Sequence, residues 1–337
     1  MSSLSDLKGT SVPLQEFHDV ALVDLDGVVY RGPHAVESAP EALADARTAG
    51  MRIMYVTNNA NRPPSSVAEH LTSLGMPTST DEVMTAAQAG ALLLAQQVKA
   101  PARVLVVGGE GLRIAVAELG YEIVESADDA PDAVIQGFNP DLRWRDLAEG
   151  AYAVQRGAIH VATNLDLTIP NERGIAPGNG ALVQAIVTAT GVRPPAAGKP
   201  EPAMFHLAAE RAGAENPVMI GDRLDTDLQG ARAAGYRGLL VLTGVNTARD
   251  AVLAPPEHRP SYIAEDLTGL AQAHPAPVRE GDRWTVGGAS ASVEEGRLVV
   301  AGGSAIDQIR AACAAAWASA DAGRPLDLES VPDFGVA

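Results

Sequence analysis

Residues 20–27 of the chain read VALVDLDG and give the first strong indication of a fold. The four apolar residues at 20–23 show no polar alternation, which predicts a strand buried on both faces, as in a parallel sheet. The strand then ends abruptly in two acidic side chains, Asp24 and Asp26, and in Gly27. Ligands of open parallel sheets bind beyond the carboxyl ends of the strands. The two carboxylates therefore stand where a functional site is expected.

Helices and strands alternate after this first strand, and again from about residue 200 onward. Gly50 closes the first helical stretch, and Pro63 and Pro64 open the next one. This βαβα order predicts a right-handed, mostly parallel sheet covered by helices. The expected helices are 38–49, 63–74, 202–212, 228–234 and 266–273, and the expected strands are 20–23, 52–56, 218–220 and 238–242.

The segment between these two halves has its own α/β rhythm. We expect strands there at 104–107, 133–135 and 159–162, and helices at 144–155 and 181–190. The simplest arrangement is a core domain that is discontinuous in sequence, formed by residues 14–82 and 193–273. Residues 83–192 would then be a second domain inserted into it.

The character of the chain changes after the Pro-rich segment 274–277. Short antiparallel strands are expected at 284–286, 291–293 and 298–300, and an Ala-rich helix at 306–320 follows them. Residues 278–337 would form a small ββα-like module, and because about 60 residues bury little core alone, we expect it to be docked. The predicted class is α/β: a Rossmann-like parallel-sheet core, an inserted α/β domain and this appendage.

Composition narrows the range of partners and compartments. The chain has 337 residues, of which 46% are hydrophobic and 20% charged, so a large core can be buried. A net charge of −17 disfavours nucleic acid and anionic lipid as partners. The single cysteine, Cys313, excludes an intramolecular disulfide. No signal peptide is recognisable at the N-terminus and no apolar run approaches the ~18 residues of a membrane span. We expect a soluble, cytoplasmic protein.

Polar side chains follow three of the predicted core strands, 20–23, 52–56 and 218–220, and a further segment supplies Lys199. Because the carboxyl ends of parallel strands meet at one edge of the sheet, these side chains are expected to converge. Four carboxylates, a lysine and several amide or hydroxyl groups would share that edge. The residues are Asp24, Asp26, Thr57, Asn58, Asn59, Lys199, Asp222 and Asp227.

Such a cluster of carboxylates is unfavourable unless a cation lies within it. Hard oxygen ligands without histidine or cysteine point to Mg²⁺, which also takes phosphate oxygens as ligands. Lys199 and the amides of Asn58 and Gly27 would suit a dianionic phosphoryl group. With an aspartate beside both metal and phosphate, attack by Asp24 to form an aspartyl-phosphate is the natural reaction.

Four ordered motifs carry a family resemblance at this point. Residues 24–28 (DLDGV), 57–59 (TNN), 198–200 (GKP) and 221–227 (GDRLDTD) resemble those of the haloacid dehalogenase-like phosphatases. The insert resembles the C2-type cap of the branch that contains NagD-like, phosphoglycolate and pyridoxal-phosphate phosphatases. The resemblance covers residues 19–273, and bacterial glycerol-3-phosphate phosphatases with a C-terminal extension are the nearest group within it.

The resemblance implies a role for each motif residue. Asp24 would be the nucleophile and a Mg²⁺ ligand, and Asp222 would be a second ligand. Asp26 would be the general acid and base and would bind the metal through its main-chain carbonyl. Asp227 would support the ligands from outside the coordination sphere. The phosphate would be bound by Gly27, Thr57, Asn58, Asn59 and Lys199.

Substrate choice is expected to lie in the cap, because the motif residues all bind the phosphoryl group that every substrate shares. Residues 164–180 have the Gly, Pro and polar content of a mobile loop between a strand and a helix. Within this segment, Asn164, Asp166 and Arg173 are the candidate specificity residues.

Several readings of the function stay open at this stage. The expected activity is Mg²⁺-dependent hydrolysis of a small phosphate monoester, with glycerol 3-phosphate first. Phosphoglycolate, pyridoxal phosphate and nucleoside monophosphates are the alternative substrates. A phosphotransferase or mutase, and a catalytically silent phosphate-binding or scaffold protein, are the rival classes. The resemblance also implies that a cap of this type can mediate a homodimer.

Overall fold

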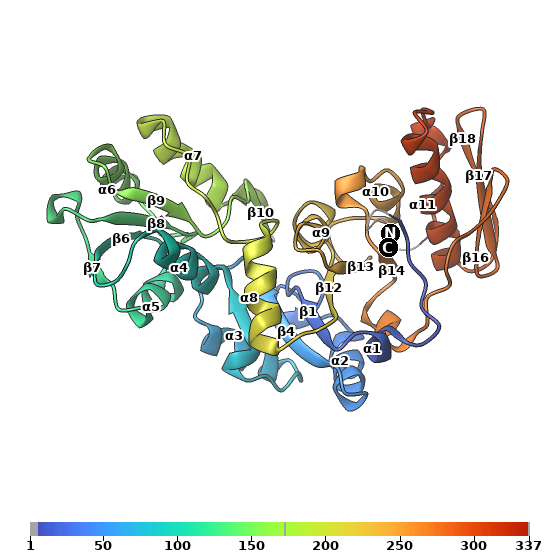
Figure 1. The fold of residues 1–337 in the computed structure, drawn as a ribbon, viewed down its shortest axis with the longest axis horizontal. Coiled ribbons are helices and arrows are strands. Elements are labelled where there is room, and N and C mark those ends of the chain that lie inside the picture. The colour runs from blue at the N-terminus through green and yellow to red at the C-terminus, as the bar shows by residue number, and fades with distance from the viewer. Residues whose placement is uncertain (1–5, 172, 336–337) are drawn as a thin grey trace. The chain divides into compact units, whose positions relative to one another are not determined.

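The computed structural model describes residues 6–171 and 173–335 (Figure 1). Residue 172 of the predicted loop and residues 336–337 of the predicted C-terminal module lie outside the described residues. The chain divides into two compact units. Residues 1–54 and 209–337 form the first unit, and residues 55–208 form the second.

A six-stranded sheet has the order β14-β13-β12-β1-β4-β5. Strand β1 pairs in parallel with β12, β12 with β13, and β13 with β14, and β4 pairs in parallel with β5. All four residues of β1 are buried, as their unbroken apolar run predicts. The parallel-sheet core is therefore confirmed. Its strands are β1 (Val20–Val23), β4 (Arg52–Thr57), β5 (Val83–Thr85), β12 (Pro217–Gly221), β13 (Arg237–Val241) and β14 (Tyr262–Ala264).

Two strands of this sheet are absent from the sequence-based prediction. Both β5 and β14 are three residues long, which is too short for a recognisable pattern. Strand β5 lies just beyond the predicted domain boundary at residue 82. Its residues 83–85 nevertheless pair with β4 of the core sheet.

Short helices and turns complete this part of the first unit. The predicted helix at 266–273 is wrong, because a 3₁₀ turn, η5 (Leu267–Ala271), stands there. The predicted helix at 228–234 begins earlier, in a π-helical turn, η3 (Leu224–Leu228), that continues into α9 (Gln229–Ala233). The other elements are α1 (Leu14–Phe17), β2 (Tyr30–Arg31), β3 (His34–Ala35), α2 (Ala39–Thr48), α10 (Ala248–Val252) and η4 (Pro256–His258).

The second unit contains a separate four-stranded parallel sheet of order β7-β6-β8-β9. The helices expected at 144–155 and 181–190 are found as α6 (Trp144–Gln155) and α7 (Asn179–Thr190). The remaining elements are α3 (Pro64–Ser73), η1 (Thr80–Glu82), α4 (Ala86–Gln97), β6 (Arg103–Val107), α5 (Glu110–Glu118), β7 (Glu122–Val124), η2 (Ala127–Asp129), β8 (Ala133–Gln136) and β9 (Ile159–Ala162). Helix α8 (Pro202–Ala212) begins in this unit and ends in the first.

The segment 164–180 differs from its prediction as a loop. It contains an antiparallel hairpin of β10 (Thr168–Asn171) and β11 (Gly174–Pro177). Each of these strands carries a proline, which argues against a strand in the centre of a sheet. In a two-stranded ribbon both strands are edges, so proline is tolerated and the sequence pattern misleads.

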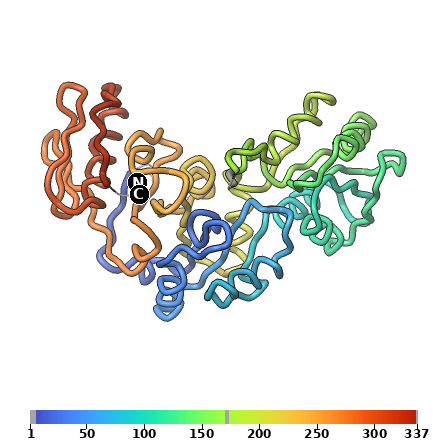
Figure 2. Tube along the Cα trace, turned by 180° about the vertical axis from the view of Figure 1, so that it is seen from behind, coloured from blue at the N-terminus to red at the C-terminus, as the bar shows by residue number. Residues whose placement is uncertain are grey.

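The C-terminal module has one more strand than predicted. Its antiparallel sheet has the order β15-β16-β17-β18, and helix α11 (Ala305–Asp321) lies beside it in Figures 1 and 2. The extra strand, β15, has three exposed residues, so no burial pattern marks it in the sequence. The strands are β15 (Val278–Glu280), β16 (Arg283–Val286), β17 (Ala289–Glu294) and β18 (Arg297–Gly302), and a short turn, η6 (Leu328–Ser330), follows α11.

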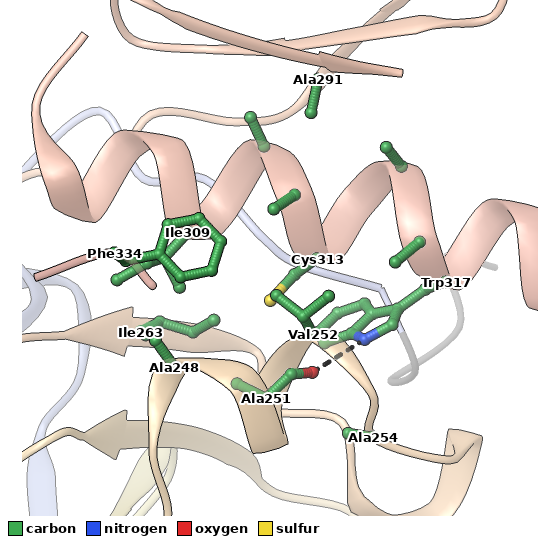
Figure 3. Close-up of a cluster of buried hydrophobic side chains, with 14 of the residues drawn as sticks. Ala248, Ala251, Val252, Ala254, Ile263, Ala291, Ile309, Cys313, Trp317 and Phe334 are labelled. Carbon is green, nitrogen blue, oxygen red and sulfur yellow. Dashed lines mark hydrogen bonds between the residues drawn. The ribbon is translucent and has the colours of Figure 1, made fainter. Parts of the chain in front are cut away.

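A shared hydrophobic cluster docks this module within the first unit, as expected (Figure 3). Ile309 and Cys313 of α11 are fully buried in the same cluster as Ile263 of β14. The indole N–H of Trp317 donates to the main-chain oxygen of Ala251 at 3.0 Å. Cys313 is thus a core residue, and burial raises the pKa of its thiol far above the usual range.

A buried polar contact joins the same two parts. Arg310 of α11 is 5% exposed and donates twice to the main-chain oxygen of Ile263, at 3.0 and 2.7 Å. It also lies 3.3 Å from Nδ1 of His274 and 3.3 Å from the carboxylate of Asp307. The other ring nitrogen of His274 lies 3.1 Å from the main-chain oxygen of Gly269. Burial, reinforced by the nearby guanidinium, lowers the pKa of His274 to about 4.

We expect the protein to lose stability as the pH falls from about 6.5 to about 4. Burial lowers the pKa of His18, His160 and His274 to about 4, whereas the unfolded chain takes up these protons near 6.5. Over that range the unfolded state binds more protons, so the free energy of unfolding falls by about 1.4 kcal/mol per pH unit and group. Below pH 4 this contribution is already lost. Thermal melting between pH 7 and 4 measures the slope.

The variant His274→Gln should flatten this slope by about a third, because three histidines share the effect. The matched change His34→Gln, at an exposed histidine, should leave the slope as in the wild type. Equal slopes for all three proteins would contradict the role assigned to His274.

Candidate active site

Three buried carboxylates meet in the first unit. Each of Asp24, Asp222 and Asp227 offers one carboxylate oxygen within 4.8 Å of the others. Asp24 is 8% exposed, Asp222 1% and Asp227 0%. The sheet explains the meeting: β1 and β12 are paired in parallel, and the main-chain N–H of Asp24 donates to Ile220 O at 2.9 Å. Acidic residues that follow the two strands therefore lie side by side.

Asp222 is held by a loop that the sequence analysis did not single out. The N–H of Val245 donates to its carboxylate at 2.7 Å, and the N–H of Asn246 donates to its main-chain oxygen at 3.1 Å. A Cβ atom on Gly244 would run into the Asp222 carboxylate, so this close approach requires glycine. The loop 243–246 follows strand β13, and applying the strand-end rule to that strand too would have found it.

The same loop ties down the turn after Asp24. The hydroxyl of Thr243 donates to the main-chain oxygen of Gly27 at 2.6 Å, and the Arg31 guanidinium donates to the main-chain oxygen of Thr243. The N–H of Gly27, predicted to bind phosphate, donates to Tyr30 O at 2.9 Å. A phosphate at this position would have to share that N–H.

The donor set of the carboxylate cluster fits a magnesium ion. Its three side chains offer only hard, anionic oxygens, and three buried carboxylates so close together repel one another unless a cation compensates them. The carboxylate of Asp227 lies within this group and accepts the main-chain N–H of Arg223 at 3.1 Å, and its predicted role in supporting the ligands stays a prediction. Asp26 is exposed. Among the described residues, the carboxylate cluster contains Asp24, Asp222 and Asp227 but not Asp26. Its predicted contact through the main-chain carbonyl stays a prediction.

The second unit holds the predicted phosphate-binding side chains. Thr57 is the last residue of β4 and is 3% exposed, and its hydroxyl oxygen accepts the N–H of Asn59 at 3.1 Å. Lys199 is also 3% exposed, and its ammonium group donates to Val56 O at 3.3 Å. The ammonium of Lys199 is thus held at the carboxyl end of β4 by Val56, the residue that precedes Thr57.

The side chains of the two asparagines after Thr57 form hydrogen bonds with other residues of this unit. The side-chain oxygen of Asn59 accepts the main-chain N–H groups of Asn61 and Arg62, at 2.8 and 3.3 Å, so it shapes the turn before α3. The side-chain amide of Asn58 is bonded to Lys199 and Asp166. Whether their main-chain groups bind phosphate stays a prediction.

The predicted specificity residues are found in different surroundings. Asn164 is buried and donates to the main-chain oxygen of Asn58 at 2.8 Å. Asp166 is half-buried, and Arg173 is exposed in the turn between β10 and β11. A role for these three residues in substrate choice stays a prediction.

Comparison with known proteins places these observations in a family. A model of haloacid dehalogenase-like hydrolases matches residues 21–122, and a related HAD-hydrolase-like model matches residues 196–270. The chain is a haloacid dehalogenase-like hydrolase. The two matched segments contain the predicted motifs: Asp24 and Thr57 lie in the first, and Lys199 and Asp222 lie in the second.

Several relatives of this hydrolase are named as phosphatases or as a nucleotidase. It is 48% identical over 255 residues to the D-glycerol 3-phosphate phosphatase of Mycobacterium tuberculosis, covering 76% of this chain and 71% of that one. It is 36% identical to a 5′-nucleotidase of Bacillus subtilis, covering 73% of this chain and 95% of that one. An acid sugar phosphatase of Staphylococcus aureus is 35% identical, with coverages of 73% and 94%.

A solved structure of similar architecture is the glycerol phosphate phosphatase of Mycobacterium tuberculosis in complex with magnesium. It matches with a TM-score of 0.84 and 42% identity over 94% of each chain. So extensive a match must include much of the C-terminal module. A p-nitrophenyl phosphatase from Archaeoglobus fulgidus matches 75% of this hydrolase and 98% of its own chain, with a TM-score of 0.70 and 28% identity.

A helix that spans a membrane needs both sufficient length and apolar character. No helix among the described residues is both long enough and apolar enough to cross a bilayer.

Proposed function

We propose that this hydrolase is a Mg²⁺-dependent phosphatase that hydrolyses glycerol 3-phosphate through an aspartyl-phosphate on Asp24. The observation that carries the proposal is the buried cluster of Asp24, Asp222 and Asp227. Family membership and the phosphatase relatives support the same reaction.

The magnesium ion would be held by Asp24, Asp222 and the main-chain carbonyl of Asp26, and Asp227 would support these ligands from outside the coordination sphere. When bound, the ion offsets the negative charge of the carboxylates and of the phosphate, which otherwise repel each other. The Val245 N–H keeps one Asp222 carboxylate oxygen in a defined direction, so the ligand set is organised in advance.

The chemistry divides into two displacements at phosphorus. In the first, a carboxylate oxygen of Asp24 bonds to phosphorus while the bond to the ester oxygen breaks, and protonated Asp26 donates its proton to the leaving alkoxide. In the second, water bonds to phosphorus, Asp26 accepts its proton, and the bond to Asp24 breaks. Inorganic phosphate and the original carboxylate result. The exposed position of Asp26 suits contact with both the leaving group and water.

The hydroxyl of Thr57 and the ammonium of Lys199 would bind the phosphoryl oxygens. Both side chains are buried and held at the carboxyl end of β4, so little conformational freedom is lost when they bind. The main-chain N–H groups of Gly27, Asn58 and Asn59 complete the predicted phosphate site.

Glycerol 3-phosphate is the favoured substrate because the 48% identical relative is named for it. The nucleotidase and sugar phosphatase relatives share 36% and 35% identity, so nucleotides and sugar phosphates are the second candidates. The discrimination would arise in the cap, where Asn164, Asp166 and Arg173 remain the predicted residues.

The domain, partner and compartment assignments belong to the same proposal. The core would comprise 14–82 and 193–273, the cap 83–192, and the C-terminal module 278–337, with residues 83–85 contributing a strand to the core sheet. We further propose a cytoplasmic homodimer that acts on a small metabolite and binds neither nucleic acid nor membranes. The net charge of −17 supports the last point.

With Mg²⁺ present, glycerol 3-phosphate should give the highest kcat/KM of a panel of phosphate monoesters, by roughly 10-fold or more. The panel should contain phosphoglycolate, pyridoxal phosphate, a nucleoside monophosphate and a sugar phosphate. Inorganic phosphate should appear without any added acceptor, which a phosphotransferase or mutase would need. If another monoester ranks first, the substrate is wrong, and if none is hydrolysed, a phosphate-binding or scaffold role replaces catalysis.

A further inference from the structure

The side chain of Asn58 makes a two-point contact with the backbone of Lys199. Its Nδ2 donates to Lys199 O at 2.9 Å, and the N–H of Lys199 donates to its Oδ1 at 2.8 Å. One planar amide thus engages both main-chain polar groups of the lysine. Two simultaneous hydrogen bonds restrict rotation of this residue more than a single bond does. The base of the Lys199 side chain is thereby fixed.

The far end of Lys199 is held as well. Its ammonium nitrogen donates to Val56 O at 3.3 Å, and the residue is only 3% exposed. Val56 and Asn58 flank Thr57 at the end of β4. The direction of the lysine side chain is therefore defined by the residues on either side of the phosphate-binding threonine.

Asp166 supports the orientation of the Asn58 amide that the two main-chain groups of Lys199 already require. Its Oδ2 accepts the second N–H of Asn58 Nδ2 at 2.9 Å. A carboxylate can only accept, so it requires the NH₂ side of the amide and rejects the flipped orientation. Both N–H donors of the Asn58 side chain are then used, by Lys199 O and by Asp166. Of the Asn58 donors, the one left for a phosphate is the main-chain N–H.

Buried neighbours hold Asp166 in place. Its main-chain N–H donates to Asn164 Oδ1 at 3.1 Å, and Asn164 Nδ2 donates to Asn58 O at 2.8 Å. Asn179 donates to Asn164 O at 2.8 Å, and it is 1% exposed. These bonds connect the segment after β9 to the residues that carry the phosphate-binding groups.

A glycine allows the close approach on the lysine side. The N–H of Gly198 donates to Thr163 O at 2.7 Å. A Cβ atom on Gly198 would lie 2.7 Å from both Asn58 Oδ1 and Thr163 O, which is too close for a side chain.

We infer that Asn58 and Asp166 are positioning residues that act in series on Lys199. This inference rests on the proposed function, in which Lys199 binds the phosphoryl group. Asp166 holds the Asn58 amide in place, and the amide fixes Lys199. The side chain of Asn58 therefore contributes to the reaction without touching the phosphate. Asp166, one of the three residues predicted to select among substrates, instead affects all substrates alike, which leaves Asn164 and Arg173 with the predicted selecting role.

Double-mutant cycles in kcat test the serial order. Lys199→Ala should lower kcat roughly 10²–10³-fold, as for the loss of one group that stabilises the transition state. Asn58→Ala should lower it roughly 10–10²-fold in the wild type, because a displaced lysine loses its alignment. In the Lys199→Ala background the same change should cost no more than about 2-fold. If the two losses multiply, the inference is wrong.

Variants of Asp166 give a second test, which remains informative if Asn58→Ala fails to fold. Asp166→Ala should lower kcat roughly 10-fold with every substrate, and Asp166→Asn, which keeps an acceptor oxygen, should restore it to within about 3-fold. The matched control Asp128→Ala changes an aspartate of the same unit whose side chain is 83% exposed, and it should have no effect. A loss confined to one substrate, or no rescue by asparagine, would overturn the positioning role.

Hydrogen exchange gives a readout that does not depend on turnover. The main-chain N–H of Lys199 donates to Asn58 Oδ1, so Asn58→Ala and Asp166→Ala should both speed its exchange while Asp128→Ala does not. An unchanged rate in the first two variants would contradict the inference even if the wild-type protein hydrolysed none of the esters. Inactivity of the wild type would instead remove the proposed function, so the two failures can be told apart.

Discussion

Asp24→Asn is expected to lower kcat for glycerol 3-phosphate by roughly 10⁴-fold or more. The amide has almost the same shape as the carboxylate, but it is a poor nucleophile and cannot form the acyl phosphate. Asp24 is 8% exposed and lies in the cluster with Asp222 and Asp227, so the fold should tolerate the change well. Removing one of three mutually repelling charges also costs no electrostatic stability. Steady-state release of inorganic phosphate measures the loss, and circular dichroism checks the fold.

The matched control for this change is Asp225→Asn. Asp225 lies in the same motif segment as Asp227, but its side chain is 53% exposed and pairs with Arg223 at the surface. We expect activity within about 2-fold of the wild type, since exposed ion pairs contribute little. Substantial hydrolysis by Asp24→Asn would remove Asp24 from its role as nucleophile, whatever the control does.

Removal of the metal should have an effect of similar size. Treatment with a chelator should lower the rate by roughly 10³-fold or more, and added Mg²⁺ should restore it, because the site otherwise presents three carboxylates to a phosphate dianion. Ca²⁺ should not restore the rate, since its larger and more variable coordination shell does not favour in-line geometry. Activity in the presence of chelator would contradict the magnesium site.

A melting experiment tests the same site without turnover. Mg²⁺ that binds the folded state should raise the melting temperature of the wild type by mass action. Asp222→Asn should abolish this rise, because it removes one charged ligand while keeping an acceptor for the Val245 N–H at 2.7 Å. Asp225→Asn again serves as the control and should keep the rise. A wild-type shift that persists in Asp222→Asn would place the metal elsewhere.

Much of the core could be predicted because its signals are local. An unbroken apolar run such as 20–23 marks a strand buried on both faces, and the residue after it stands at the ligand-binding edge. This logic placed Asp24 and Asp222 together, and the structure confirms that they are neighbours. It missed β5 and β14 because three residues carry no periodicity, and it misread 164–180 because prolines in an edge ribbon resemble those of a loop.

The same local logic assigned Asn58 to phosphate because it follows a strand. The partners that occupy its side chain are distant in sequence: Asp166 is 108 residues away and Lys199 is 141. The Val245 N–H that holds Asp222 is 23 residues away and is a main-chain group, which any residue type can supply. Contacts of this kind leave no pattern in one sequence.

The sequence by itself determined the family and the polar residues that stand at the ends of the core strands, among them the groups proposed to react, because each of these depends on which residue follows a short apolar run. Only the tertiary structure decided that the 243–246 loop holds Asp222 and that the side chain of Asn58 contacts Lys199 and Asp166. Those arrangements follow from hydrogen bonds between groups that only folding brings together, and several of the partners are main-chain groups, which almost every residue carries.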